Sequence, residues 1–405
     1  MGGRRLPRKE TLIAGVLIAG MALAAACDRG TASNGSSSPA PSSPTPPPTA
    51  SPTPDPLGPP PETADAAVKG LERLLAATPG DPCPEALNRA WETVCAAGDL
   101  DGDGLPDTAY LVPLKPPLQP SPNPGAVLVR RSKGSGIERF PTTGDADRSI
   151  VGRGLFGIAD RTGDTTPELS FLSNECSARG CSSMVQVQHW DGTAWRDVGP
   201  RAGVDNIDRV TMEGQGAKTV ITMHGGAITG PGAGPGRAFT VTYEVESARF
   251  QQRSKAFDPP VYLYHALLDA DARFDAADWP GAIQAYRVAI DSTDLKDWRQ
   301  EANKGDGRTT LAAYALFRIA VATAASGEKP DKAIDAIILN AKEEIFINAA
   351  LAFRKGFQEK GGVHAGCVDV TTYLADPANA DYIADRFDYG YANQPKKTAR
   401  DMCPL

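Results

Sequence analysis

Four aspartates stand close together in one short stretch of the chain, residues 98–107. Hard cations such as Ca²⁺ take six to eight oxygen ligands at about 2.3–2.6 Å, and a tight loop supplies them from alternate residues. The spacing offers four carboxylates at loop positions 1, 3, 5 and 9 and a backbone carbonyl at position 7, which are Asp99, Asp101, Asp103, Asp107 and Leu105. Gly104 permits the sharp turn that such a loop requires. The pattern predicts a Ca²⁺ site, and the alternative is a solvated acidic turn.

A second acidic stretch lies 61 residues further along and has the same layout. Its expected oxygen ligands come from two aspartates, one glutamate and two threonines, which are Asp160, Asp164, Glu168, Thr162 and Thr166. Thr165 stands where the first loop has glycine, and this loop has one carboxylate fewer. We therefore expect it to bind Ca²⁺ more weakly than the first loop.

Each loop leads through a proline and a carboxylate into an expected strand, at 108–112 and at 169–172. An EF-hand would need glutamate at position 12, where the first loop has Tyr110, and a helix would follow it. The loops instead resemble those of FG-GAP and VCBS-type (integrin-like) repeats, whose last ligand is the aspartate at position 9. The resemblance covers about 63–255, too little for a full propeller. It implies a small β domain built as an open sheet, a sandwich or an incomplete propeller.

The hydrophobic pattern divides the folded part into two regions, which makes the fold class α+β. Residues 63–255 are expected to form one helix at 64–77 and then strands at 108–112, 126–130, 169–172, 184–190, 218–223 and 238–245. Residues 256–405 are expected to be α-helical, with helices at 262–274, 280–290, 310–325, 330–340, 343–357 and 363–374. Asp278, Asp331 and Thr309 are the expected helix caps.

The helical region contains a stretch that resembles the second helix of a tetratricopeptide repeat. Ala282, Tyr286 and Ala289 fall at the small, aromatic and small positions of that motif. Ala333 and Ile337 form a weaker copy, 51 residues after the first instead of about 34. The resemblance implies helical hairpins with a concave surface that binds peptide segments. The alternative is that these residues only pack the helices.

The first 27 residues have the pattern of a secretion signal. A basic segment precedes an uncharged run at 11–26, which is short for a bilayer core of about 30 Å. The run ends in Leu23-Ala24-Ala25-Ala26-Cys27, which resembles the lipobox of bacterial lipoproteins, although leucine usually stands where Ala24 does. The resemblance implies lipidation of Cys27 and anchoring on the extracytoplasmic face of the cell membrane. Release after cleavage and an uncleaved anchor are the alternatives.

Residues 28–62 are rich in Pro, Ser and Thr and have no apolar periodicity, so we expect a disordered tether. The six cysteines beyond Cys27 are an even number, which suits structural disulfides in an oxidising compartment. Proximity in the sequence favours Cys83–Cys95, Cys176–Cys181 and Cys367–Cys403, with other pairings left open. Zinc ligation is the alternative, but the four histidines do not show ligand spacing with these cysteines.

The formal net charge of −7 argues against nucleic acid as a partner and suits cation binding. The glycine-rich stretch 225–236 lacks the Gly-Lys-Ser/Thr of a phosphate-binding loop and is typical of a hairpin loop. Since no catalytic motif stands out, we expect a non-enzymatic binding or scaffold module for an envelope protein or wall component. The alternative is an exported hydrolase whose active site lies between the two domains.

Overall fold

The computed structural model describes residues 57–115, 125–134, 136–140, 149–150, 153–177, 180–228, 230, 232–393 and 396–405. Cys27, the expected secretion signal and most of the expected tether lie outside these ranges. Within them, no helix is both long and apolar enough to cross a bilayer.

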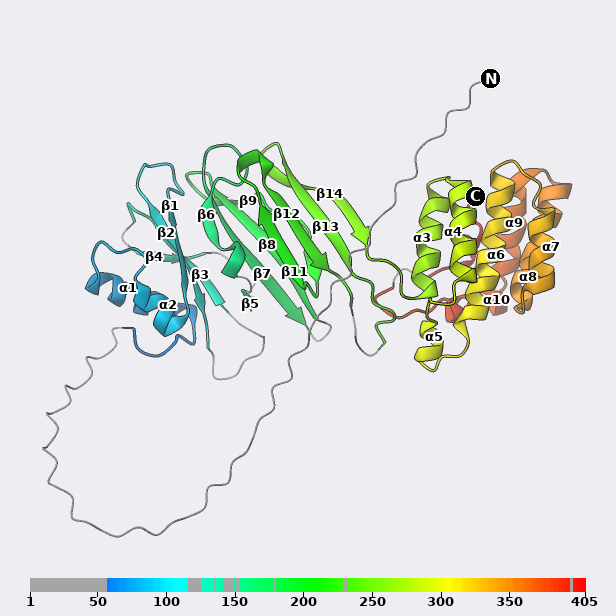
Figure 1. Cartoon of the computed structure of the whole chain (residues 1–405), viewed down its shortest axis with the longest axis horizontal. Helices are drawn as coiled ribbons and strands as arrows, with labels where there is room; N and C mark the ends of the chain where they lie inside the picture. Colours follow the sequence, from blue (N-terminus) through cyan, green and yellow to red (C-terminus); the bar gives the residue numbers. More distant parts are fainter. Residues whose placement is uncertain are drawn as a thin grey trace, which may run out of the picture. The chain divides into compact units, whose positions relative to one another are not determined.

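Antiparallel sheets make up the region from 94 to 257 (Figure 1). Their strands are β1 (Val94–Gly98), β2 (Asp107–Pro113), β3 (Gly125–Arg130), β4 (Ile137–Arg139), β5 (Ser149–Ile150), β6 (Gly157–Ala159), β7 (Glu168–Ser177), β8 (Gly180–Trp190), β9 (Trp195–Asp197), β10 (Val204–Asp205), β11 (Arg209–Glu213), β12 (Val220–Gly225), β13 (Phe239–Glu246) and β14 (Arg249–Phe257). The first sheet has the order β1-β2-β3-β4 and the third β11-β12-β13-β14. The second has the order β10-β8-β7-β5, with β6 beside β7 and β9 beside β8.

Alternate residues of a strand point to opposite faces of its sheet. Where both faces are apolar, a sheet can pack against a neighbour on each side. Ala109 of β2 shares a buried apolar cluster with Leu169 of β7, which joins the first sheet to the second. Leu172 of β7 shares another cluster with Ile221 of β12, which joins the second sheet to the third. Tyr110 of β2 points the other way, into a cluster with two helices. The β region is therefore a stack of layers.

Those two helices are α1 (Ala64–Ala77) and α2 (Glu85–Trp91), which lie against the first sheet (Figure 1). The side chains of Leu71, Leu74 and Trp91 are buried in the same cluster as Tyr110. Leu57, within the segment expected to be a tether, is also buried there. The packed structure therefore includes residues before the expected boundary at 63.

The helical region contains α3 (Leu263–Asp275), α4 (Trp279–Asp291), α5 (Trp298–Glu301), α6 (Gly307–Ala325), α7 (Asp331–Asn340), α8 (Glu344–Glu359), α9 (Gly362–Leu374), α10 (Pro377–Arg386) and α11 (Ala399–Met402). Helix α4 packs between α3 and α6, and α8 packs along α9 (Figure 1). Ala282, Tyr286 and Ala289 of α4 are all buried in the core of this region. The α+β class is confirmed, with sheets in the first half and helices in the second.

The expected strands and helices are all present, with bounds that differ by a few residues. Asp278 caps α4 as expected and accepts a hydrogen bond from the N–H of Gly281 at 3.0 Å. The other two expected caps are wrong. Asp331 is the first residue of α7, and α6 begins earlier than expected because Asp306 caps it, accepting from the N–H of Thr309 at 3.1 Å.

Two of the expected disulfides, Cys83–Cys95 and Cys367–Cys403, are confirmed. Cys181 is also disulfide-bonded, and the register of β7 and β8 places the backbone of Cys176 opposite it. The side chain of Cys176 lies outside the described residues, so the third pairing stays a prediction.

The C-terminal segment contacts the loop between β12 and β13 as well as the helices. The N–H of Tyr391 donates to the carbonyl of Gly232 at 3.0 Å, and Asn393 Nδ2 donates to the carbonyl of Pro235 at 3.3 Å. Arg237, at the end of the same loop, makes a bidentate ion pair with Asp269 of α3 at 2.7 and 2.8 Å. The glycine-rich stretch thus joins two strands, as expected, and the C-terminal tail packs against it.

Candidate metal sites

The two acidic loops each connect two antiparallel strands. Loop 1, residues 99–107, joins β1 to β2 and ends on the first residue of β2, and loop 2, residues 160–168, joins β6 to β7 and ends on the first residue of β7. The register pairs Gly98 with Asp107 at the base of loop 1 and Ala159 with Glu168 at the base of loop 2. The repeat seen in the sequence is therefore a repeated hairpin, which includes a strand before each loop.

Backbone N–H groups donate to the carboxylates in the same pattern in both loops. The carboxylate at position 1 accepts a hydrogen bond from the N–H at position 6. The carboxylates at positions 5 and 9 accept from the N–H groups at positions 7 and 2, respectively. These donor–acceptor pairs are Gly104–Asp99, Leu105–Asp103 and Leu100–Asp107 in loop 1, and Thr165–Asp160, Thr166–Asp164 and Arg161–Glu168 in loop 2. The acidic side chains thus define the shape of each loop.

Positions 4 and 6 of both loops have positive backbone φ angles. In loop 1 both residues are glycines, Gly102 at +74° and Gly104 at +82°. In loop 2 they are Gly163 at +81° and Thr165 at +75°. A β-branched residue in this conformation is strained, on the order of 1–2 kcal/mol. Loop 2 therefore has the same turn as loop 1 but a less favourable residue in it.

Three of the expected ligands of loop 1 converge. Asp99, Asp101 and Asp107 each offer one oxygen, and these oxygens lie within 4.8 Å of one another. Oxygens on opposite sides of one Ca²⁺ ion would lie about 4.6–5.2 Å apart, so the cluster has a suitable size. Asp107 is fully buried and accepts from the N–H groups of Leu100 at 2.8 Å and Ser132 at 2.7 Å. Burial and the neighbouring Asp107 carboxylate raise the pKa of Asp101.

Asp103, the expected ligand at position 5, is engaged elsewhere. Its Oδ2 accepts from the hydroxyl of Ser132 at 2.8 Å and lies 3.1 Å from Lys133 Nζ. The N–H of Leu105, with these two side chains, lowers the pKa of Asp103. Leu105, expected to offer its carbonyl, has a half-exposed side chain. A role for either residue as a ligand stays a prediction.

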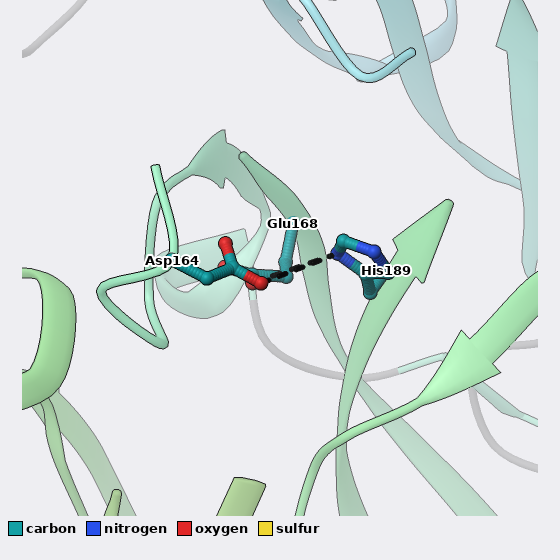
Figure 2. Close-up of side chains that lie close together, drawn as sticks. All are labelled: Asp164, Glu168 and His189. Carbon is teal, nitrogen blue, oxygen red and sulfur yellow. Dashed lines mark ion pairs between the residues drawn. The ribbon is translucent and has the colours of Figure 1, made fainter. Parts of the chain in front are cut away.

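Loop 2 brings together Asp164, Glu168 and a histidine from outside the loop, His189 of β8 (Figure 2). His189 Nδ1 lies 3.9 Å from Asp164 Oδ2 and 4.0 Å from Glu168 Oε1. Glu168 is fully buried and accepts from the N–H of Arg161 and the hydroxyl of Thr162, both at 2.6 Å. Burial raises the pKa of Glu168, because the charged carboxylate has lost water.

The other expected ligands of loop 2 hold its shape. Asp160 accepts from the N–H of Gly163 at 2.6 Å, the Thr162 hydroxyl binds Glu168, and the N–H of Thr166 donates to Asp164 at 2.9 Å. A role for Asp160, Thr162 and Thr166 as metal ligands stays a prediction.

His189 was not identified from the sequence. It lies 21 residues beyond Glu168, in the next strand, and no spacing rule links a loop to a residue on a neighbouring strand. The register of β7 and β8, which pairs Leu169 with Gln188, brings the imidazole beside Glu168. Only the strand pairing could have revealed it.

A groove of about 970 Å³ lies on the helical region, lined by α4, α6 and α7. Its apolar lining includes Ile283, Leu316 and the exposed Val288. Its charged residues are three cations, Arg287, Lys329 and Lys332, and two acids, Asp291 and Glu328. The lining of the groove is therefore partly apolar and carries a small excess of positive charge.

No family model, curated protein or solved structure matches this chain.

Proposed function

We propose that this protein is a lipid-anchored binding module of the cell envelope, whose β region is stabilised by Ca²⁺ in loop 1. The observation that carries the proposal is the convergence of Asp99, Asp101 and Asp107 in a hairpin loop that the chain builds twice. The stacked sheets suit the FG-GAP-like resemblance, because consecutive blades of an incomplete propeller would pack in this way.

Calcium would act here as a structural ion. Three carboxylates within 4.8 Å repel one another, and a divalent cation between them removes that repulsion. Asp107 is the central ligand, since its carboxylate also accepts from Ser132, which follows β3. An ion bound at Asp107 would therefore stabilise the β1–β2 hairpin together with the segment after β3.

The helical groove is the proposed binding surface. Its apolar lining and the cations Arg287, Lys329 and Lys332 suit a segment of an envelope protein or wall component that carries apolar and acidic groups. Cys27 would hold the module at the membrane, and the tether that follows would let the folded part reach its partner. We propose no catalytic role for the groove.

Thermal unfolding of the full-length protein, in Ca²⁺ and in excess EGTA, tests the proposal. Ca²⁺ at about 100 times its dissociation constant should stabilise the fold by about 2.7 kcal/mol. At roughly 2–4 °C per kcal/mol, the melting temperature should rise by about 5–10 °C. Asp107→Asn should remove this rise, whereas Glu72→Gln, on the exposed side of α1, should keep it. The readout is the difference in melting temperature between the two solutions. The melting temperature itself is not used, because Asp107→Asn also weakens hydrogen bonds and so lowers stability in both solutions.

The absence of any Ca²⁺-dependent rise in the wild-type protein would contradict the proposal. So would an undiminished rise in Asp107→Asn. Asp103→Asn should reduce the rise by less than Asp107→Asn does, because the Asp103 carboxylate binds Ser132 and Lys133.

A further inference from the structure

We infer that loop 2 and His189 form a site for a first-row transition-metal ion, with Zn²⁺ as the representative, and that this site is chemically distinct from loop 1. The inference rests on the proposed function only in treating the acidic loops as cation sites. It assigns a different ion class to the second of them.

The environment of the His189 imidazole favours a bound metal ion. His189 Nδ1 is buried from solvent and has no hydrogen-bond partner among the described residues. It points at Asp164 and Glu168, at distances too long for hydrogen bonds (Figure 2). A buried nitrogen without a partner is unfavourable, and a metal ion between the three side chains would supply the missing partner.

The separation of the donor atoms also suits a metal ion of this size. Zn²⁺ binds imidazole nitrogen and carboxylate oxygen at about 2.0–2.2 Å, so two such ligands in tetrahedral geometry lie roughly 3.3 Å apart. His189 Nδ1 lies 3.9 and 4.0 Å from the two carboxylate oxygens. A side-chain movement of about 0.7 Å would therefore close the site. Asp164 is 35% exposed and His189 23%, so an ion can enter and water can complete the coordination.

The donor atoms of loop 2 differ in type from those of loop 1. Ca²⁺ takes oxygen ligands, whereas imidazole suits Zn²⁺ and its first-row neighbours. Loop 1 brings together three carboxylates and no histidine among its described residues. In the first repeat, the register of β2 and β3 pairs Thr108 with Arg130. In the second, the register of β7 and β8 pairs Leu169 with Gln188. The residue that follows Arg130, Arg131, is therefore the equivalent of His189, which follows Gln188. Arg131 stacks on Trp190 at 3.6 Å, and it cannot bind a metal ion.

The central ligand of this site, Glu168, is held in place by other contacts. Glu168 is fully buried, and the N–H of Arg161 and the hydroxyl of Thr162 hold its two carboxylate oxygens. Such second contacts orient a ligand and raise metal affinity. Two carboxylates and a neutral imidazole carry a charge of about −2, which a divalent ion balances. The alternative is a protonated imidazole that forms ion pairs with both carboxylates.

The test is titration of chelator-treated, full-length protein with ZnCl₂ and with CaCl₂, in competition with a chromophoric chelator. Wild-type protein should bind one Zn²⁺ at loop 2. His189→Gln and Asp164→Asn should each weaken Zn²⁺ binding at least tenfold. The matched control is His364→Gln, at an exposed histidine of α9, which should leave Zn²⁺ binding unchanged. Asp164 is partly exposed, so Asp164→Asn serves if His189→Gln fails to fold.

The variant Asp107→Asn separates this inference from the proposed function. It should remove Ca²⁺ binding at loop 1 and leave Zn²⁺ binding at loop 2. If Ca²⁺ binding is absent but the Zn²⁺ results hold, only the proposed function fails. Equal Zn²⁺ affinity in wild type and His189→Gln would overturn the inference in favour of the ion-paired imidazole. Displacement of the bound Zn²⁺ by equimolar CaCl₂ would overturn it as well.

Discussion

Asp271, a buried carboxylate of α3, should contribute several kcal/mol to the stability of the helical region. It accepts hydrogen bonds from the hydroxyls of Tyr286 and Tyr314, the latter at 2.7 Å, and from Lys397 Nζ at 2.7 Å. The guanidinium of Arg318 lies 3.6 Å away and is itself almost fully buried. This network connects α3, α4 and α6 with the C-terminal tail.

Asp271→Asn keeps the size of the side chain but removes its charge. Arg318 and Lys397 then lose a carboxylate partner in a region with little water, and the new amide N–H₂ meets other donors. Breaking a buried ion pair from one side costs about 3–5 kcal/mol. We expect a loss of about that size in the free energy of unfolding.

Asp275→Asn is the matched control, because Asp275 lies in the same helix and faces the same cation. Its carboxylate is 68% exposed, against 9% for Asp271, and lies 3.8 Å from Arg318. An exposed ion pair contributes about 0–1 kcal/mol. Urea denaturation followed by circular dichroism at pH 7 should therefore separate the two variants by at least about 2 kcal/mol. Similar losses in both variants, or a loss under about 1 kcal/mol in Asp271→Asn, would refute the reasoning.

Three further predictions concern other contacts. Gly234→Ala should destabilise the protein, measured by urea denaturation, because its Cβ would lie 1.6 Å from the Tyr389 carbonyl oxygen; an unchanged midpoint would contradict this. Hydrogen bonds to Asp208 and Asp258 raise the pKa of His224, so its contribution to stability should be complete below about pH 6.5 and be lost as pH rises through the raised value. Unfolding free energies from pH 5.5 to 8.5 should show this fall in wild type and not in His224→Gln. Thr165→Gly should leave the free energy of unfolding of the metal-free protein unchanged or raise it by up to about 1 kcal/mol, because glycine adopts the positive φ angle of this position without strain.

The elements with strong hydrophobic periodicity were predictable from the sequence. The helix expected at 64–77 has these bounds in the structure, because its apolar face and its end signals at Thr78-Pro79-Gly80 agree. Strand β1, before loop 1, is not predicted by the sequence pattern, because Val94–Gly98 contains small residues with weak strand propensity. It is a strand because β2 pairs with it, which is a tertiary effect.

The candidate metal sites were likewise predictable from the sequence only in part. The ligand spacing of loop 1 could be recognised in the sequence, since all its carboxylates lie within nine residues of one another. The sequence could not show which of these carboxylates converge. Asp103 does not, because it contacts Ser132 and Lys133, some 29 residues further along. Such a contact depends on the position of the next hairpin and not on local spacing.

The sequence by itself therefore determined the α+β class, the two acidic loops and the likeness between them, because these follow from local composition and periodicity. Only the tertiary structure decided that the sheets stack in layers and that Cys367 and Cys403 meet. It also decided that an imidazole stands beside the carboxylates of loop 2 while an arginine occupies the corresponding place near loop 1. The reason is that strand register joins residues far apart in the chain, and a single loop carries no information about its neighbour across the sheet.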